Sequence, residues 1–391
     1  MKLKSRPRSS GKVLLRTLLF LLAAVVALSG LYMAYALSVY EEPPVDPQWA
    51  LRGSEVIPPG AVTVRFSGTA TLLFSDGETQ WMTDGWFTRP GPLRLLFGKI
   101  APDPQAIERG LAANQVTRLA AVLPVHSHYD HAMDAPEVAR RTGALLLGSE
   151  STANIGRGWG VPEAQLQVLV DRQPVRLGQF VITPIESRHF EFPDPAIRER
   201  ALGDPEISAP LVPPVRVFDY RLGKAYVLHV SHPRGNWLIV GSAGYVEGAL
   251  QGLRADTVFL GVGGLGSQTP EYMEDFWRET VTAVSPSRII PIHYDSLTAP
   301  VEGPFRGQVK KTSGAARRRP GGRLAFLRGK AAVIPGCASI RCRDLTKSRA
   351  VPVSVGAAGF VLGGEHRGRT PPPGQAVTEY PVVLAAAVAA M

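Results

Sequence analysis

Histidine and aspartate side chains cluster in one short stretch of the sequence, LPVHSHYDHAMD. It holds His126, His128, Asp130 and His131 in an H-x-H-x-D-H pattern, directly after a run of apolar residues. Three of the eight histidines of the chain fall within these six positions, which argues against a surface loop that is rich in histidine by chance. Two alternate histidines can bind one metal ion, and the adjacent Asp–His pair can bind a second. Imidazole and carboxylate donors suit Zn²⁺, and Fe and Mn also accept them.

The apolar runs around this cluster predict a layered α/β domain that begins near Ala61. The segments AVTVRF, TLLF and TQWMTD predict short strands, residues 102–114 suit a helix, and residues 118–125 predict a buried strand. Further apolar runs follow at VRVFDYRL, AYVLHV, NWLIVG and TVFLGV, and residues 271–284 predict a helix. Strands that come first and are then mixed with helices favour sheets covered by helices.

Residues 17–40 form a run of 24 residues without a charge, which is long enough to span a bilayer. Six basic and no acidic residues lie in segment 1–16, and acidic residues follow the run. The positive-inside rule therefore predicts a single-pass membrane protein with a cytoplasmic N-terminus and an extracytoplasmic domain, facing the periplasm if the source is a bacterium. A cleaved signal peptide is the alternative, with Ala34-Tyr35-Ala36 as its site. Both interpretations export the domain.

The segments on either side of the domain have a different composition. Residues 41–60 contain five prolines and predict a stiff linker, and the domain itself is expected over residues 61–304. The basic tail, residues 305–391, has no sustained period and is expected to be mostly disordered; a shifted reading frame is the alternative. Since the two ends carry +6 and +12 of a net charge of +10, the middle of the chain carries −8 and is mildly acidic, and no nucleic-acid partner is expected. Two late cysteines without a C-x-x-C pattern argue against a cysteine metal site.

The motifs resemble those of the metallo-β-lactamase superfamily over roughly residues 61–300, most of all the branch that includes ascorbate-lactonase-like and phospholipase-D-like hydrolases. The resemblance implies a four-layer αββα sandwich, here preceded by one N-terminal transmembrane helix. It implies that Asp84, in WMTDGWF, supports the histidine loop from behind the ligands. His189, in ITPIESRHF, matches the third histidine of the first metal, and His293, in RIIPIHYD, matches the last histidine of the second.

The resemblance therefore implies two metal sites, most simply a dizinc centre, with Fe or Mn as alternatives. The first metal would have three histidine ligands: His126, His128 and His189. The second would have one carboxylate, two histidines and water, the protein ligands being Asp130, His131 and His293.

The sequence departs from the family pattern at two positions. Ser242, in NWLIVGSAGY, stands where the family usually has an aspartate that bridges both metals. Some branches have serine there and still hold two metals, so we expect a weaker second site, and function with one metal stays open. Thr69, in SGTAT, stands where close relatives often have histidine.

A two-metal site of this kind implies a hydrolase in which metal-activated hydroxide attacks an ester, lactone, amide or phosphodiester. Asp130 would hold the second metal and orient the nucleophile. The substrate would be a small molecule or a lipid, and membrane tethering through residues 17–40 favours a lipid or envelope substrate. The alternative is a non-catalytic metal-binding or interaction protein, which the missing bridging aspartate favours. A redox diiron enzyme is disfavoured because no flavin domain follows.

Three other histidines and a glycine-rich segment are assigned no metal. His229 and His232, in AYVLHVSHPRG, are expected to be structural or exposed. His366 lies in the tail and is expected to have no role. The segment GVGGLG, residues 261–266, lacks the context of a dinucleotide-binding fold and is expected to form a loop near the site.

Overall fold

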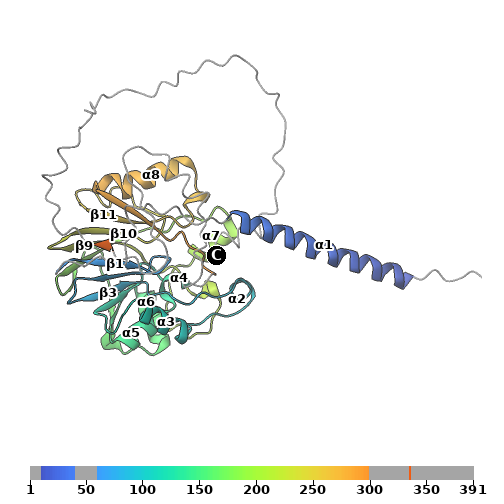
Figure 1. Cartoon of the computed structure of the whole chain (residues 1–391), viewed down its shortest axis with the longest axis horizontal. Coiled ribbons are helices and arrows are strands. Elements are labelled where there is room, and N and C mark those ends of the chain that lie inside the picture. The colour runs from blue at the N-terminus through green and yellow to red at the C-terminus, as the bar shows by residue number, and fades with distance from the viewer. Residues whose placement is uncertain (1–9, 40–59, 299–333, 336–391) are drawn as a thin grey trace, which may run out of the picture.

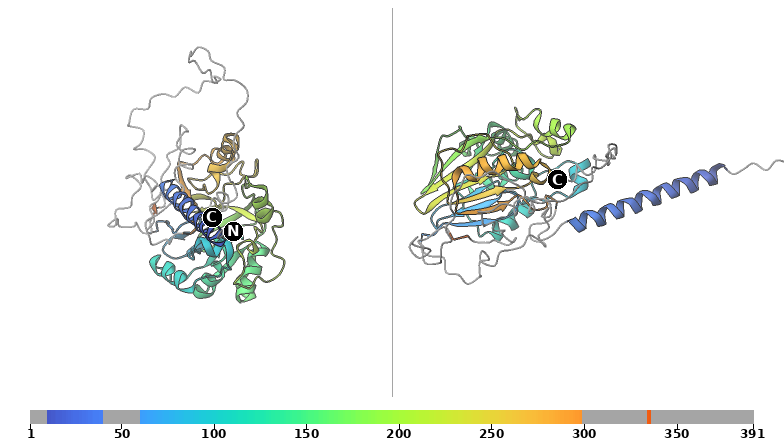
Figure 2. Two further views of the ribbon diagram at one scale, coloured as in Figure 1. Left: turned by 90° about the vertical axis from the view of Figure 1, so that its right-hand side faces the viewer. Right: turned by 90° about the horizontal axis from the view of Figure 1, so that it is seen from above.

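The structure is a computed structural model that describes residues 10–39, 60–298 and 334–335. Two β-sheets pack face to face, and helices cover both outer faces (Figure 1, Figure 2). The first sheet has the strand order β13 (Ile334–Pro335), β1 (Thr63–Phe66), β2 (Leu72–Ser75), β3 (Gln80–Thr83), β4 (Ala121–Leu123), β5 (Leu145–Gly148), β6 (Leu166–Val168). The second has the order β12 (Arg288–Ile292), β11 (Thr257–Gly261), β10 (Gly235–Val240), β9 (Ala225–His232), β8 (Phe180–Ser187), β7 (Val175–Leu177).

Each sheet has an antiparallel part followed by a parallel part. In the first sheet β1, β2 and β3 pair antiparallel, and β3 to β6 pair parallel. In the second sheet β7 to β10 pair antiparallel, and β10, β11 and β12 pair parallel. The loops that follow parallel strands leave the sheet at one edge, where ligands bind in open α/β sheets. The predicted site residues after β3, β4, β10 and β12 therefore belong to such an edge.

Aromatic side chains fill the space between the sheets. The ring of Phe74, on β2, lies edge-on to Phe180 of β8, Trp237 of β10 and Phe259 of β11, with ring centroids 5.8–6.4 Å apart. These residues belong to one buried apolar cluster that spans both sheets. Burial of such large side chains is the main stabilising contribution to the domain.

The outer faces of the sheets are covered by α3 (Pro104–Ala113), α5 (Ala135–Thr142) and α6 (Glu150–Trp159) on one side and by α8 (Pro270–Thr280) on the other. Val138 of α5 packs with the strand residues Val122 and Leu146, whereas Phe276 of α8 belongs to the same buried apolar cluster as residues of the second sheet. The predicted four-layer αββα sandwich is confirmed. The run VRVFDYRL differs from the other apolar runs, because it forms a short 3₁₀ helix at Val217–Asp219 instead of a strand.

The apolar N-terminal run is helical, as α1 (Ser10–Val39). The helix begins before the uncharged run. Lys12 and Arg16 end the run of uncharged residues, but both are good helix formers and so allow the helix to continue. Its segment Gly11–Tyr32 is long and apolar enough to cross a membrane, a property that signal sequences share.

The predictions for residues 1–9, for the linker at 40–59 and for most of the tail, including its cysteines and His366, lie outside the described residues. Within the tail, β13 is described and pairs antiparallel with β1, Ile334 opposite Val64 and Pro335 opposite Thr63.

Candidate metal centre

The histidine loop, residues 124–131, runs from the end of β4 into the short helix α4 (Tyr129–Ala132). His128 precedes α4 in an extended conformation with φ −60° and ψ 156°, and Asp130 and His131 lie in the helix. This change from extended to helical backbone lets closely spaced side chains point toward two adjacent groups of candidate metal ligands. His126 and His131 are 1% and 0% exposed, so the sequence buries two imidazoles side by side.

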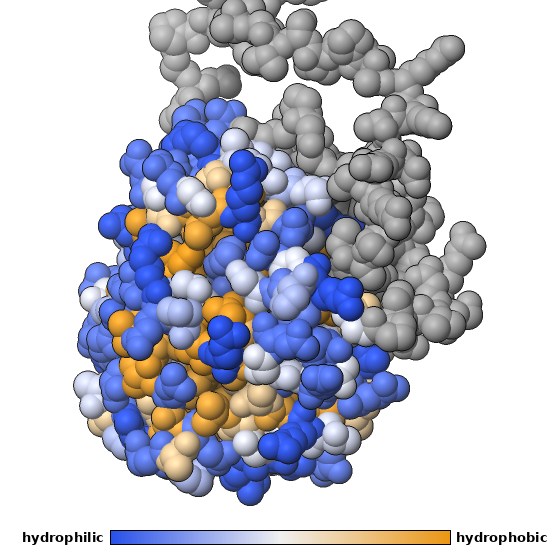
Figure 3. Space-filling view, turned by 90° about the vertical axis from the view of Figure 1, so that its left-hand side faces the viewer, coloured by the Kyte–Doolittle hydropathy of each residue, from blue (hydrophilic) through white to orange (hydrophobic). Residues whose placement is uncertain are grey.

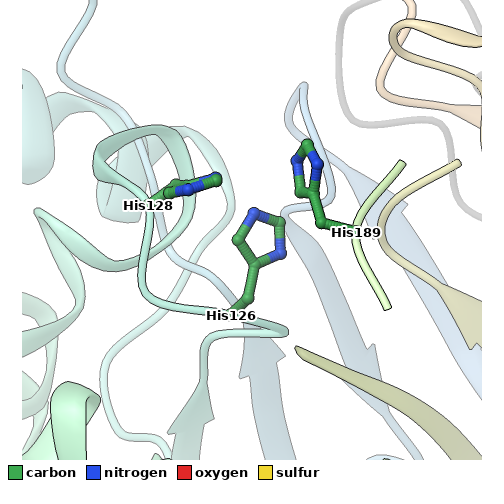
Figure 4. A group of neighbouring side chains, drawn as sticks. All are labelled: His126, His128 and His189. Carbon is green, nitrogen blue, oxygen red and sulfur yellow. The ribbon is translucent and has the colours of Figure 1, made fainter. Parts of the chain in front are cut away.

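The first group of candidate ligands consists of His126, His128 and His189, whose rings converge (Figure 4). One ring nitrogen of each lies within 4.8 Å of those of the other two. His189 follows β8, and its Nδ1 lies 2.8 Å from the carbonyl oxygen of Phe190, which leaves Nε2 available. His128 Nε2 lies 3.3 Å from the carbonyl oxygen of Ala201, which leaves Nδ1 available.

The second group consists of Asp130, His131 and His293. His293 Nε2 lies 3.2 Å from His131 Nε2 and 3.3 Å from Asp130 Oδ2, and His131 Nε2 lies 3.5 Å from the same carboxylate oxygen. The ring centroids of His126 and His131 are 3.9 Å apart, so the two groups adjoin each other. All six predicted ligands are therefore brought together in two neighbouring triads.

Asp84, which the family resemblance placed behind the ligands, contacts the histidine loop. It follows β3, is fully buried, and accepts hydrogen bonds from His131 Nδ1 at 2.7 Å and from the backbone N–H of Val125 at 3.0 Å. The first bond fixes the proton on His131 Nδ1, so that Nε2 presents its lone pair to the second triad. Asp84 has φ +53°, a strained conformation for a residue with a side chain.

Three chain segments together hold His293. Its backbone N–H donates to the carbonyl oxygen of Thr69 at 2.7 Å, and the N–H of Thr69 donates to Asp295 Oδ1 at 2.7 Å. Asp295 Oδ2 pairs with Arg89 at 3.0 Å, and these two side chains are 6% and 3% exposed. Arg89 also donates to Thr69 Oγ1 at 3.2 Å and lies over the ring of Trp86. Thr69 and His293 both have positive φ, so this network holds a strained pair of turns.

Burial controls the protonation of the first triad. It lowers the pKa of His128 to about 4, and together with the neighbouring imidazoles it lowers the pKa of His126 and His189 well below the usual range. These rings are therefore neutral at neutral pH, the form that binds metals.

Charge pairing outweighs burial in the second triad. Burial alone would raise the pKa of Asp130, but His131 and His293 hold it well below its usual value. Burial alone would lower the pKa of His131, but the carboxylates of Asp84 and Asp130 raise it. Asp130 is therefore ionised, and it is the acceptor around which the two imidazoles of this triad gather.

The donor atoms are suited to binding metal. Among the described residues, Nδ1 and Nε2 of buried His126 both lack a hydrogen-bond partner, an arrangement that is costly unless another species binds there. With Zn–N distances of about 2.0–2.1 Å, neighbouring ligands of a tetrahedral zinc lie about 3.3 Å apart. The 3.2–3.5 Å separations in the second triad match this value. Nitrogen and carboxylate donors suit zinc, iron and manganese alike.

The remaining predicted residues lie in and around this frame. Ser242 follows β10, and its buried Oγ has no hydrogen-bond partner among the described residues. His229 lies on β9 and contacts the carbonyl oxygen of Arg254, whereas His232 lies 3.4 Å from Asp76; neither belongs to a triad. A Cβ atom at Gly263 would lie 2.6 Å from His293 Nδ1, so the glycine-rich loop contacts the site as predicted.

A cleft of about 380 Å³ opens onto both triads. Its walls come from α2 (Pro92–Phe97), α7 (Pro195–Leu202) and the segment 216–220. Leu96, Phe97, Phe192 and Phe218 are among the lining side chains, and exposed Arg200 and Arg216 lie at the rim. The arrangement therefore places candidate metal ligands at the base of a largely apolar cleft that can hold a small molecule.

Comparison with known proteins gives a consistent result. No family model matches the chain. A UPF0173 metal-dependent hydrolase from Pyrobaculum arsenaticum is 22% identical over 258 residues, which cover 64% of this chain and 93% of that protein. The chain is therefore similar to a metal-dependent hydrolase. This likeness agrees with the enzyme class predicted from the sequence, a metal-dependent hydrolase.

Two solved structures are also similar. Igni18, a metallo hydrolase from Ignicoccus hospitalis, is 14% identical with a TM-score of 0.43, over 70% of this chain and 98% of that chain. The metallo-β-lactamase fold protein YhfI from Bacillus subtilis is 14% identical with a TM-score of 0.41, over 71% of this chain and 100% of that chain.

Sequence analysis missed several residues that position the site. Arg89 and Asp295 form the buried pair behind His293, and Asp134 accepts hydrogen bonds from the N–H groups of Phe87 and Thr88 at 2.8 and 2.6 Å. Asp295 lies two residues after His293, and Asp134 lies three residues after His131. A carboxylate this close to a predicted ligand was the sequence signal that could have identified both. Arg89 had no comparable signal.

Proposed function

We propose that this chain is a membrane-tethered hydrolase with a dinuclear metal centre, most simply dizinc. The main support is the pair of adjoining triads, because both nitrogens of buried His126 are without a partner among the described residues while five further donors converge beside it. A fold needs no such cluster for stability, since unpaired buried imidazoles destabilise it. The similarity to metal-dependent hydrolases agrees with this assignment.

The residues of the site would each have a defined role. When bound, two metals supply hydroxide near neutral pH and positive charge that stabilises an anionic transition state. Ionised Asp130 holds the second site and accepts a hydrogen bond from the attacking water, which orients it. Asp84 keeps the proton of His131 on Nδ1. Burial of Asp130 and His131 at the base of the cleft limits their contact with water, which strengthens these interactions.

The chemistry and shape of the cleft support a proposal for the substrate class. A metal-assisted attack suits an ester, lactone, amide or phosphodiester, and the apolar walls suit a small molecule or lipid with an apolar group. The span Gly11–Tyr32 would tether the domain to a membrane, with a cytoplasmic N-terminus and the domain on the opposite side, facing the periplasm in a bacterium.

Metal analysis of the full chain in detergent, followed by a hydrolysis screen, tests this function. We expect one to two equivalents of zinc, iron or manganese, and loss of that metal in the double variant His126→Ala, His128→Ala. His229→Ala is the matched control, because this histidine lies on β9 outside both triads. Full occupancy in the double variant would exclude the assigned site. Metal binding without turnover of any ester, lactone, amide or phosphodiester would favour a non-catalytic metal-binding protein.

A reporter fusion tests the topology separately. A periplasmic reporter joined after Pro59 should be active in a bacterial host, and a cytoplasmic reporter should be silent. The reverse pattern would place the domain in the cytoplasm. A mature protein that begins at Leu37 would replace the tether by a cleaved signal peptide.

A further inference from the structure

One rim of the metal cleft presents apolar side chains to solvent. Within the six-residue helix α2, Leu95 is buried and packs with Trp86 and other members of one core cluster. On the outer face Leu93 and Phe97 are 74% and 82% exposed, and Leu96 is 39% exposed. Leu96 and Phe97 also line the cleft. Adjacent exposed apolar side chains at a functional opening indicate a binding surface, because scattered single residues are the norm elsewhere.

The charges around α2 favour an anionic partner. Between Asp84 and Asp103 the sequence has three basic residues and no acidic one. Arg89 is buried, whereas Arg94 and Lys99 are exposed, and no ion pair is found for either within the described part of the chain. Exposed leucine and phenylalanine flanked by arginine and lysine are typical of segments that insert shallowly into anionic lipid surfaces.

We propose that Leu93, Leu96 and Phe97 insert into the interfacial region of a lipid bilayer, so that the metal cleft opens at the membrane surface. The proposal rests on the membrane tether of the proposed function. The 20 residues at 40–59 separate α1 from the domain, a length that reaches at most roughly 70 Å when extended. The tether thus keeps the domain close enough to the bilayer for a weak, shallow contact to be occupied most of the time.

This contact would give the cleft direct access to membrane-embedded substrates. Leu96 and Phe97 lie on one side of the opening, and Ile197 of α7 and Phe218 lie among its other lining residues. An apolar chain can therefore pass from the lipid to the site along apolar walls without crossing bulk water. The face turned away from α2 and α7 also has apolar areas, but hydrophilic side chains interrupt them (Figure 3).

Depth-dependent fluorescence quenching of the full chain in vesicles tests the lipid contact. In a Cys337→Ser, Cys342→Ser background, Phe97→Cys is labelled with an environment-sensitive dye. Val170→Cys is the matched control, because Val170 is 56% exposed and does not line the cleft. Both proteins are reconstituted into vesicles of phosphatidylcholine and phosphatidylglycerol, with or without bromine on the upper acyl chain. We expect brominated lipid to reduce the emission at position 97 about twofold, and to leave the emission at position 170 unchanged.

Equal emission at position 97 with and without bromine, in protein that floats with the vesicles, would overturn the proposal. Protein that fails to float with vesicles would instead contradict the tether, and with it the proposed topology. A change in emission at position 97 that requires no vesicles and grows with protein concentration would assign this face to a second copy of the chain, which also overturns the lipid contact.

Discussion

Replacing Asp84 by asparagine should weaken the second metal site through the proton of one histidine. Asp84 accepts two hydrogen bonds, from His131 Nδ1 and from the N–H of Val125. An asparagine has one acceptor oxygen and one donor nitrogen, so it can serve only one of these donors. If the oxygen stays on Val125, the amide donates to His131 Nδ1, and the proton of the ring moves to Nε2. That nitrogen faces Asp130 and His293 and can then no longer bind a metal.

The size of the effect follows from the geometry. If the asparagine oxygen instead faces His131, the amide NH₂ group faces the backbone N–H of Val125 at the 3.0 Å separation of the present bond. Two buried donors then face each other, which costs about 1–3 kcal/mol. Loss of a partner behind a ligand typically lowers metal affinity about 10- to 100-fold, or about 1.4–2.7 kcal/mol. The two estimates agree, so we expect the dissociation constant of the second metal to rise by about this factor, and that of the first by less than about threefold.

Zinc titration of the metal-free full chain against a competing chelator measures both constants. Asp76→Asn is the matched control, because Asp76 is also a buried aspartate beside a histidine, His232, but lies outside the cleft. It should leave both constants unchanged. If Asp84→Asn binds two zinc ions as tightly as the unaltered chain, the role assigned to this aspartate is wrong.

Three further substitutions give separate expectations. Arg89→Met leaves the buried charge of Asp295 unpaired and should lower the free energy of unfolding by about 3–5 kcal/mol, measured by chemical denaturation. The control Arg198→Met breaks an exposed ion pair and should lower it by less than about 1 kcal/mol. Ser242→Asp adds a carboxylate where an unpartnered hydroxyl lies and should tighten the second metal; an unchanged titration would show that residue 242 does not point between the metals. Burial raises the pKa of Asp134 to about 7, so ionisation of this side chain opposes folding. The free energy of unfolding of the unaltered chain, relative to that of Asp134→Asn, should therefore fall as the pH rises from about 4 to about 7. Parallel pH profiles of the two proteins would contradict this.

The sequence was sufficient to predict that the candidate ligands in one short segment lie close together. His126, His128, Asp130 and His131 lie within six consecutive positions, so their convergence depends only on one strand-to-helix turn. His293 and Asp84 were predictable because each ends a strand of an ordered series, and parallel strands bring such ends to one edge. The layered fold followed from the same alternation of strands and helices.

Residues that act through distant partners were not predictable in this way. Arg89 is 206 positions from Asp295 in the sequence, and only the packing of the two sheets places them 3.0 Å apart. The sequence around Arg89, GWFTRPGP, gives no sign that its guanidinium group is buried. The exposed face of α2 was not predictable for the opposite reason. A short apolar run predicts burial, and only the tertiary structure shows that Leu93 and Phe97 are 74% and 82% exposed.

Backbone strain at the site shows what the supporting residues achieve. Thr69, Asp84 and His293 all have positive φ, a conformation that costs a residue with a side chain about 1–3 kcal/mol and persists only where the surroundings impose it. Each is held by a hydrogen bond from its backbone N–H to another residue. The N–H of Thr69 donates to Asp295, that of His293 donates to the carbonyl oxygen of Thr69, and that of Asp84 donates to the carbonyl oxygen of Leu123. The fold itself therefore fixes the position of the second triad. Metal affinity at this triad should then depend on residues that never contact the metal, which is why we expect Asp84→Asn to affect the second site more than the first.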